Sequence, residues 1–218
     1  LVARNDKGYR NLCELLSSSY SEGQSMGVAG LTRNAIAEKS HGLIALSGGR
    51  EGDVGKALLA GNLEEAKRLA GRWQEIFPDA FYIELHRTGR SSEEDYNVLA
   101  VNLAIELGCP VVATNDVRFL AQEEFEAHEV RVCIHDGRTL DDPRRERRYS
   151  DQQYLKTAQE MVELFADIPE ALENSVEIAK RCNVNLDLGN YYLPEYPVPE
   201  GMTTEAFLND VSAQGLNV

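Results

Sequence analysis

The stretch Pro110-Val-Val-Ala-Thr-Asn-Asp-Val-Arg-Phe119 contains a short apolar run that ends in an acid, Asp116. A run of this length after the helix-ending Gly108 is typical of a buried β-strand. Ligands and metals in α/β proteins bind at the carboxyl ends of the strands, so Asp116 is the first candidate site residue. Two residues later, where a second metal ligand would share its face, stands Arg118, a cation that cannot ligate a cation. The stretch therefore predicts a strand-end metal site that lacks part of its ligand set.

Two similar apolar runs precede this strand, and helical patterns separate the three. We expect strands at 42–47, 81–86 and 110–114, and helices at 54–60, 62–77 and 92–107. Strands that alternate with helices favour a parallel sheet with right-handed crossovers, which is the α/β class.

Capping patterns predict where several helices begin. Asn62 is the expected N-cap of one helix, which Pro78 ends, and Ser91 with Glu94 has the spacing of a capping box. Thr157 with Glu160 forms another box, and Asp167 with Glu170 is expected to begin a further helix. Asn-, Ser- and Thr-type residues in these places accept hydrogen bonds from the first free amides of a helix.

The remaining chain divides into an α/β part and a helical extension. We expect a helix at 5–21, a loop from Gly23 to Gly30 and a short helix at 31–38 before the sheet. After Gly137 the charged segment 139–150 is a predicted connector, helices follow, and the proline-rich 191–199 is extended. The predicted domains are therefore residues 1–137 and the helical extension 138–218.

Composition limits the classes of function. The 218 residues carry a net charge of −14 and are 43% hydrophobic, which suits a globular chain and disfavours a stand-alone duplex-DNA binder. The run Arg144, Arg145, Arg147 and Arg148 is a possible basic patch, but a solvated charged loop is the favoured interpretation. The four cysteines have no metal-finger or redox spacing and are expected to be reduced core residues in a cytoplasmic protein.

Glu84 and His86 are the second pair of candidate site residues. They lie two apart on a predicted strand, so their side chains share one face near its carboxyl end. With Asp116 at the end of the next strand they could converge on a divalent metal ion. The favoured alternative is that both bond to loops or to each other. His128 and His135 are expected to be structural, His128 on a helix face.

Two other chemistries have weak support in the sequence. The loop Ser47-Gly-Gly-Arg-Glu-Gly-Asp-Val-Gly-Lys56 resembles a phosphate-binding loop, but Ala57 follows the lysine and the spacing differs. A tight turn that lets a helix pack on the strand is the better interpretation. No Gly-x-Ser-x-Gly elbow is present, and no cysteine has an evident activating neighbour.

Several stretches together resemble the bacterial replicative DNA polymerase III alpha subunits, and they run through nearly the whole chain. The stretches are residues 1–17, Leu46-Ser-Gly-Gly49, Ile83-Glu-Leu85, Ala113-Thr-Asn-Asp116, Ala127-His-Glu129, Thr139-Leu-Asp-Asp-Pro143, Glu163-Leu-Phe-Ala-Asp-Ile-Pro-Glu-Ala-Leu172, Val176-Glu-Ile-Ala-Lys-Arg-Cys-Asn183 and Tyr192-Leu-Pro194.

The resemblance implies a piece of the polymerase-and-histidinol-phosphatase (PHP) domain of such a subunit, running into the linker before the polymerase palm. The implied fold is a distorted (βα)7, TIM-like barrel with an α-helical C-terminal extension. The chain starts at Leu1 without a methionine, in what looks like the end of a strand. We therefore expect a fragment whose barrel is incomplete, with the His-x-His strand and its neighbours upstream.

The family's metal site can be compared residue by residue. Glu84 and Asp116 match metal-binding carboxylates of the family, whereas Thr88 and Arg118 occupy positions that are histidines in metal-binding members. Similar losses mark the subgroup whose PHP domain is thought to be inactive and on which a separate proofreading exonuclease subunit docks. The resemblance therefore implies that Glu84 and Asp116 are remnant ligands, with His86 a weak further one, and that no catalytic residue lies in this segment.

The implied parent protein is a DNA-directed DNA polymerase of chromosomal replication in the bacterial cytoplasm. Its expected partners are the proofreading exonuclease (epsilon) subunit, primer-template DNA, dNTPs and the sliding clamp. Mg²⁺ would serve the palm, outside this segment, and no metal is expected here. The alternative is a PHP domain that keeps a zinc- or manganese-dependent phosphoesterase or 3′–5′ exonuclease activity in the full-length protein. An unrelated barrel enzyme is the weakest hypothesis, because we find no ligand set for it.

Overall fold

A computed structural model describes residues 1–21, 23–25, 27–191 and 193–216. The chain forms two compact units, Leu1–Asn185 and Leu186–Val218. The site lies in the first unit, so most of the fold relevant to function is there.

The first unit is built on a four-stranded sheet with the order β1-β4-β5-β6. Its strands are β1 (Val2–Ala3), β4 (Leu43–Leu46), β5 (Phe81–His86) and β6 (Val111–Thr114). The three later strands are parallel, as the sequence predicts, with Glu84 opposite Val112 and His86 opposite Thr114. β1 is antiparallel to β4, so the whole sheet is mixed, and this antiparallel edge was not predicted. The strands of the described ranges form an open sheet, not a closed barrel.

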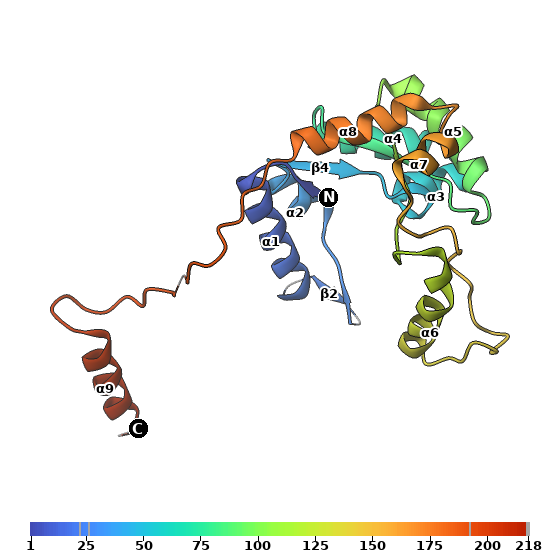
Figure 1. The fold of residues 1–218 in the computed structure, drawn as a ribbon. Helices are drawn as coiled ribbons and strands as arrows, with labels where there is room; N and C mark the ends of the chain where they lie inside the picture. The colour runs from blue at the N-terminus through green and yellow to red at the C-terminus, as the bar shows by residue number, and fades with distance from the viewer. Residues whose placement is uncertain (22, 26, 192, 217–218) are drawn as a thin grey trace. The chain divides into compact units, whose positions relative to one another are not determined.

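Helices connect and cover the strands. They are α1 (Asp6–Ser21), α2 (Arg33–Glu38), α3 (Asp53–Leu59), α4 (Leu63–Ile76), α5 (Glu93–Leu107), α6 (Phe125–Asp136), α7 (Ala158–Leu164) and α8 (Pro169–Arg181), with short 3-10 turns η1 (Gly49–Glu51) and η2 (Gln122–Glu124) (Figure 1). The loop predicted from Gly23 to Gly30 contains a small antiparallel hairpin of β2 (Gln24–Ser25) and β3 (Val28–Ala29), and Met26 lies outside the described residues.

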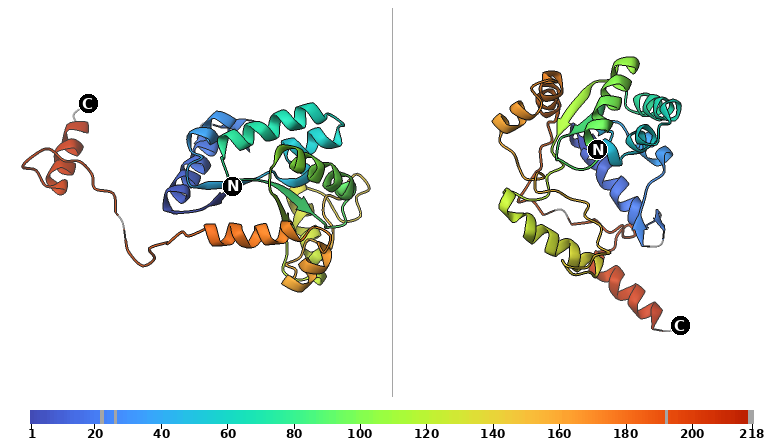
Figure 2. Two further views of the ribbon diagram at one scale, coloured as in Figure 1. Left: turned by 90° about the horizontal axis from the view of Figure 1, so that it is seen from above. Right: turned by 90° about the vertical axis from the view of Figure 1, so that its right-hand side faces the viewer.

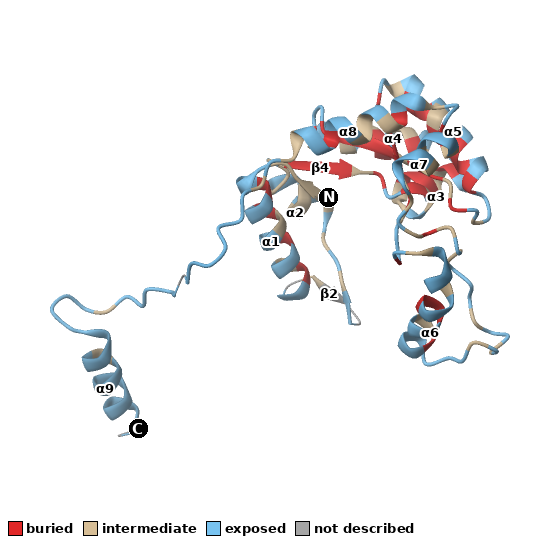
Figure 3. Ribbon diagram, in the orientation of Figure 1, coloured by how far each residue is buried: buried red, intermediate tan, exposed pale blue. Residues whose placement is uncertain are grey.

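The core lies between the sheet and helices on both of its sides. α4 and α8 lie on opposite sides of the sheet (Figure 2). Buried residues concentrate on β4 and on the inward sides of α3, α4 and α5 (Figure 3). Ile44 on β4 and Ile83 on β5 have no exposed surface. A strand that is apolar on both faces is what a sheet covered on both sides requires, which is why these strands read as continuous apolar runs.

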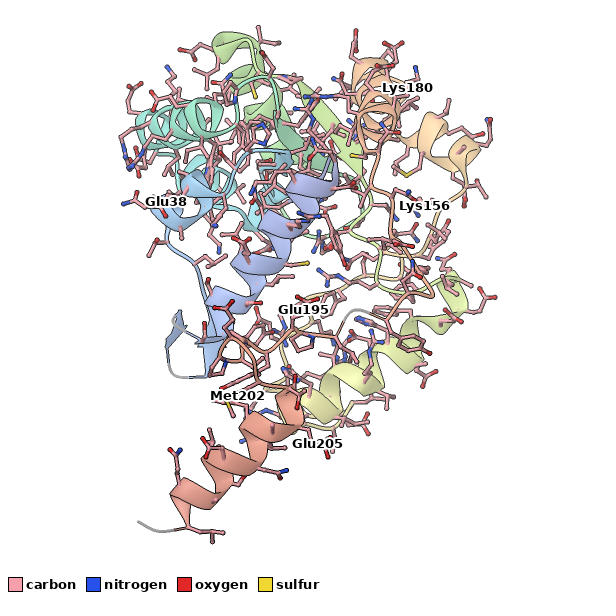
Figure 4. The ribbon with its side chains drawn as sticks, turned by 90° about the vertical axis from the view of Figure 1, so that its left-hand side faces the viewer. Glu38, Lys156, Lys180, Glu195, Met202 and Glu205 are labelled. Carbon is pink, nitrogen blue, oxygen red and sulfur yellow. The ribbon has the colours of Figure 1, made fainter. Side chains whose placement is uncertain are left out.

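α8 packs on β6 even though it lies beyond the predicted boundary at 137. Asn174 Nδ2 donates to the carbonyl oxygen of Val111 at 2.8 Å. Arg181 Nη2 donates to the carbonyl oxygen of Asp79 at 2.6 Å, whereas its neighbour Lys180 pairs with Glu177 on the exposed side (Figure 4). α8 therefore belongs to the first compact unit, and a division of the domains at 137 stays a prediction.

Two of the four predicted caps are confirmed. The Asn62 side chain accepts from the amide of Glu65, and Thr157 with Glu160 forms a full capping box at the start of α7. α5 instead begins after Ser92, which has φ of 60° and makes no side-chain cap. The predicted box of Ser91 and Glu94 is therefore wrong.

α8 begins after Ile168, again without a side-chain cap. The predicted helix is present close to its expected start, but Asp167 does not cap it and instead pairs with the distant Arg87. An acid whose local spacing suits a helix cap can instead form an ion pair with a residue far away in the sequence. The spacing alone does not reveal that distant partner.

The turn after β4 brings backbone segments very close. A Cβ on Gly52 would lie 1.8 Å from the Ser47 carbonyl oxygen, and one on Gly55 would lie 2.2 Å from the Gly49 carbonyl oxygen. Any side chain at these positions would clash, which is why glycine is needed there. The interpretation of residues 47–56 as a packing turn is thus supported by the close contacts.

The predicted environment of the cysteines is only partly correct. Cys109 and Cys133 are buried and all four thiols are free, but Cys13 is exposed rather than a core residue. Burial raises the pKa of the Cys109 thiol to about 11, so it stays protonated and inert.

The second unit consists of an extended segment and α9 (Thr204–Gly215), whose N-cap is Thr203. The ring of Tyr196 lies 6.0 Å from that of Phe207 within this unit. None of the described residues of α9 is buried. Among the described residues, no helix combines the length and apolar character needed to cross a membrane.

Candidate functional site: carboxylates at the ends of two strands

Glu84, near the carboxyl end of β5, accepts hydrogen bonds on both carboxylate oxygens. Thr114 Oγ1 donates to Oε1 at 2.6 Å, and the amide of Gly48 donates to Oε2 at 3.1 Å. The parallel register explains these contacts, because the ends of β4 and β6 lie on either side of β5. The Glu84 amide donates to the Ser47 hydroxyl oxygen at 2.9 Å, which fixes the backbone as well.

Burial and hydrogen bonding act in opposite directions on the Glu84 carboxyl. Its side chain is 14% exposed, and burial alone would favour the neutral acid. His86, Thr114 and Gly48 together outweigh that penalty and lower the pKa of Glu84 below its ordinary value. Glu84 is therefore an ionised carboxylate held by neutral donors and one imidazole.

His86 follows Glu84 on the same face, as predicted, and their side chains lie together. His86 Nε2 is 3.3 Å from Glu84 Oε1, within ion-pair reach but outside good hydrogen-bond geometry. The ring is buried, and a Cβ on Gly49 would lie 2.6 Å from Nδ1. Nδ1 has no hydrogen-bond partner among the described residues. The tight turn after β4 thus covers the imidazole.

Asp116, just beyond β6, lies between two guanidinium groups. Arg118 Nη2 is 2.7 Å from Oδ1, and Arg90 Nη1 is 3.1 Å from Oδ2. Gln153 Nε2 donates to Oδ2 at 2.9 Å and to the backbone oxygen at 3.1 Å. Asp116 has φ of 41°, a conformation that costs energy for a residue with a side chain. The surrounding contacts offset that cost.

Arg90 connects Asp116 to a second, more deeply buried carboxylate, Glu93. The Glu93 side chain is 3% exposed and its Oε1 lies 2.9 Å from Arg90 Nε. Thr88 donates to it twice, from its amide at 2.7 Å and from its hydroxyl at 2.6 Å. Burial opposes ionisation, but the bonds from Thr88 and Arg90 outweigh it and lower the pKa of Glu93.

The connector after α6 closes this network from the other side. Gln153 has no exposed surface, and its backbone oxygen accepts from the Arg118 amide at 2.8 Å. The Ser150 hydroxyl donates to the backbone oxygen of Thr88. An isolated parallel β-bridge between Phe119 and Tyr154 extends the backbone contact between the connector and the segment after β6. The connector is thus joined to the ends of both strands.

The donors around Asp116 are those of a salt-bridge network and do not suit a divalent cation. Both oxygens already face a guanidinium, and a cation placed there would be repelled by Arg90 and Arg118. Thr88, the other expected histidine position, bonds to Glu93 and is fully buried. Among the described residues, no three His, Cys, Asp or Glu side chains are grouped as a metal would require. We therefore derive no metal-dependent step from this segment.

All five predicted residues, Glu84, His86, Thr88, Asp116 and Arg118, lie at this edge of the sheet, but several of their partners were not predicted. Arg90, Glu93 and Gln153 were not predicted. Glu93 fell only within the predicted helix at 92–107, whose first turn also carries Glu94 and Asp95, and such acidic first turns commonly face solvent. The spacing of Arg90 and Glu93, three residues apart, is only weak evidence for a buried ion pair. The same spacing is also found in ion pairs on a helix surface.

His128 on α6 and Arg145 in the connector after α6 both have structural roles, and Arg145 differs from its prediction. His128 is on α6, as predicted, and packs on Phe119 and Tyr149 at ring distances of 5.4 and 4.7 Å. Burial, aided by Arg131, lowers its pKa. Arg145 is not solvated: its side chain is 7% exposed and pairs with the equally buried Glu129. The loop interpretation of the arginine run is therefore wrong at Arg145.

Comparisons with known proteins agree with this architecture. A PHP domain family model matches residues 1–88. The DNA polymerase III subunit alpha of Pseudomonas aeruginosa is 56% identical over 216 residues, 99% of this chain, and that of Escherichia coli K12 is 53% identical over 218 residues. The chain belongs to the bacterial DNA polymerase III alpha subunits, and the PHP domain match covers its residues 1–88. Of the matching stretches, Tyr192 lies outside the described residues.

The chain spans 18% of the length of each of these relatives. These matches therefore show the family of this segment only. They do not show that the segment has the activity of a whole subunit.

Proposed function

We propose that this segment is a non-catalytic scaffold within a replicative DNA-directed DNA polymerase. In this proposal the parent protein works in the bacterial cytoplasm, and a palm elsewhere in it uses Mg²⁺ to join dNTPs to primer-template DNA. The alpha-subunit relatives support the parent's activity. The segment would be part of a distorted (βα)7 barrel with its boundary near 137, and it would offer a docking surface to the proofreading exonuclease subunit. The sliding clamp would be a further partner of the parent.

The observation that carries the scaffold role is the pairing of Asp116 with Arg90 and Arg118. A carboxylate that serves metal catalysis needs lone pairs directed at an open coordination site. Two guanidiniums that share one acid instead hold separate chain segments together through charge-assisted hydrogen bonds. Glu84 and Asp116 would thus be former metal ligands that now stabilise the end of the sheet, with Thr88 and Arg118 in place of two imidazoles.

The metal content of the full-length protein tests this proposal. We expect no zinc or manganese to remain after dialysis of the protein against a weak chelator, as measured by inductively coupled plasma mass spectrometry. Two or more retained ions that are lost in a Glu84→Gln, Asp116→Asn variant would contradict the scaffold role and favour a metal-dependent phosphoesterase. Mg²⁺ is excluded from the count, because a palm would bind it independently.

Docking of the exonuclease subunit needs a separate measurement. We expect the full-length protein and a purified proofreading exonuclease subunit to co-elute in size-exclusion chromatography. A deletion of this segment that leaves polymerisation measurable should abolish co-elution. Unchanged co-elution would place the docking surface elsewhere in the parent and remove that part of the proposal.

A further inference from the structure

The second compact unit, Leu186–Val218, differs from the first in the sign of its charges. It contains no lysine, arginine or histidine, and its charged residues are the five acids Asp187, Glu195, Glu200, Glu205 and Asp210. All 22 lysines and arginines of the chain lie in the first unit. We call the described part of the second unit, residues 186–191 and 193–216, the acidic segment. Charges of a single sign suit a partner surface of the opposite sign.

The acidic segment also exposes a series of large apolar side chains. Tyr191 is 96% exposed, Leu193 is 85% exposed and Tyr196 is 66% exposed. Among the described residues of the segment none is buried, so it has no core of its own. A single exposed apolar side chain is ordinary on a protein surface, but a series of them within a short segment marks a contact surface for another protein.

The first half of the segment is held in an extended form by its prolines. Pro194, Pro197 and Pro199 fix their own backbone torsions and restrict the residues before them to extended conformations. The Tyr196 ring lies 6.0 Å from the Phe207 ring and joins this extended part to α9. The extended part therefore presents its aromatic side chains with few conformations to lose when it binds.

The second half of the segment, α9, has an apolar face with acidic edges. Phe207, Leu208 and Val211 fall on one side of the helix by their spacing. Glu205, which is labelled in Figure 4, and Asp210 flank that side. A helix of this kind packs its apolar face into a groove whose rim carries cations.

The charge of the acidic segment separates the classes of partner. Nucleic acids are polyanions and would be repelled, and so would the anionic cytoplasmic surface of a membrane. A second copy of this chain has a net charge of −14 and would be repelled as well. A protein surface with lysines and arginines around apolar pockets matches both the acids and the exposed apolar side chains.

We propose that the acidic segment docks on such a basic surface, and that this surface belongs to the parent chain outside residues 1–218. The chain spans 18% of its alpha-subunit relatives, so most of such a parent lies outside it. Residues 1–185 carry the rest of the net negative charge and offer no excess of cations. A surface in the same polypeptide also has a high effective concentration. The assignment to a parent polymerase rests on the proposed function.

Hydroxyl-radical footprinting of the full-length protein, read by mass spectrometry, tests the docking because the oxidation rate of a side chain reports its exposure to water. We expect Tyr196 to be oxidised as slowly in the native full-length protein as Tyr96, which is 1% exposed. The denatured protein gives the rate of a fully exposed Tyr196. Equal rates at Tyr196 in the native and the denatured protein would overturn the proposal, because the segment would then be a solvated linker.

Charge reversal tests the sign of the partner surface. Glu195→Lys combined with Glu200→Lys should raise the oxidation rate at Tyr196 severalfold, since both acids are exposed and would face cations in the docked state. The matched control is Glu38→Lys combined with Glu75→Lys, which reverses two exposed acids of the first unit and should leave that rate unchanged. No effect of the first pair, or equal effects of the two pairs, would overturn a basic surface as the partner.

Two further outcomes would identify a different occupant. Protection of Tyr196 that appears only when a second protein is added, or that rises with protein concentration, would overturn the parent chain as the source of the surface. Slow oxidation of Tyr96 in every variant shows that the fold is intact. Retained zinc or manganese would contradict the scaffold role and leave the docking in place, whereas an exposed Tyr196 would contradict the docking and leave the scaffold role in place.

Discussion

The ends of β5 and β6 each carry an acid at the same edge of one sheet, but their partners differ. Glu84 is held by the hydroxyl of Thr114, the amide of Gly48 and the ring of His86. Asp116 faces the two permanent cations Arg90 and Arg118. The neutral donors around Glu84 leave its negative charge available to a cation, whereas the two arginines neutralise the charge of Asp116. An acid at a strand end is therefore a poor indicator of a metal site until its partners are known.

The deepest part of the β6 network is Glu93, and its loss should have the largest effect. Glu93→Gln keeps the size of the side chain but leaves Arg90 buried with a single carboxylate partner. We expect the free energy of unfolding to fall by about 3 kcal/mol, since removal of one partner of a buried ion pair leaves an uncompensated charge. Urea unfolding followed by circular dichroism measures the change.

The adjacent acid is the matched control for that measurement. Glu94 pairs with Arg87 but is 66% exposed, and exposed pairs contribute about 0–1 kcal/mol. We expect Glu94→Gln to change stability by much less than Glu93→Gln. Equal losses in the two variants would mean that the buried network adds nothing beyond an ordinary surface pair.

A smaller effect is expected at the exposed side of the same network. Arg118→Ala removes one of the two cations from Asp116, but Arg90 and Gln153 remain. Because Arg118 is 43% exposed, we expect a loss of about 1 kcal/mol in the free energy of unfolding. Arg147→Ala is the control, since that side chain has no described partner. Equal melting temperatures for the two variants would show that Arg118 is no more than a surface arginine.

The alternation of apolar runs predicted the β4-β5-β6 sheet, because each buried strand is apolar on both faces and ends at a glycine, proline or polar residue. Glu84, His86 and Asp116 were placed at one edge for the same reason. The antiparallel edge strand β1 could not be predicted, since its pairing depends on Ile44 and Leu43 some forty positions away. Two predicted caps failed, and the acid of each, Glu94 or Asp167, instead pairs with Arg87.

The site could be predicted only as far as its acids. Arg118 beside Asp116 was visible from the sequence, since two residues of separation brings them near each other. Arg90 and Gln153 reach Asp116 from other segments of the chain, and only the fold brings them there. From the sequence, hydrogen bonds or Arg118 were expected to hold these acids, and the further partners Arg90 and Gln153 could not be predicted.

The pH dependence of stability is a further way to distinguish Glu84 from Asp116. It is the smallest of the expected effects. The pKa of Glu84 is lowered in the folded protein from an ordinary value of 4.5. Its ionised form thus stabilises the fold above that value, and the contribution is lost as the pH falls through the lower folded pKa. Glu84→Gln removes this contribution, so the difference in melting temperature from the unmodified protein should be constant near pH 7 and shrink below about 4.5.

Glu75→Gln, at an exposed acid on α4, controls for the loss of one carboxylate. A difference for Glu84→Gln that stays constant down to acid pH would show that the Thr114, Gly48 and His86 contacts do not favour the charged form, and the contrast with Asp116 would then rest on the arginines alone.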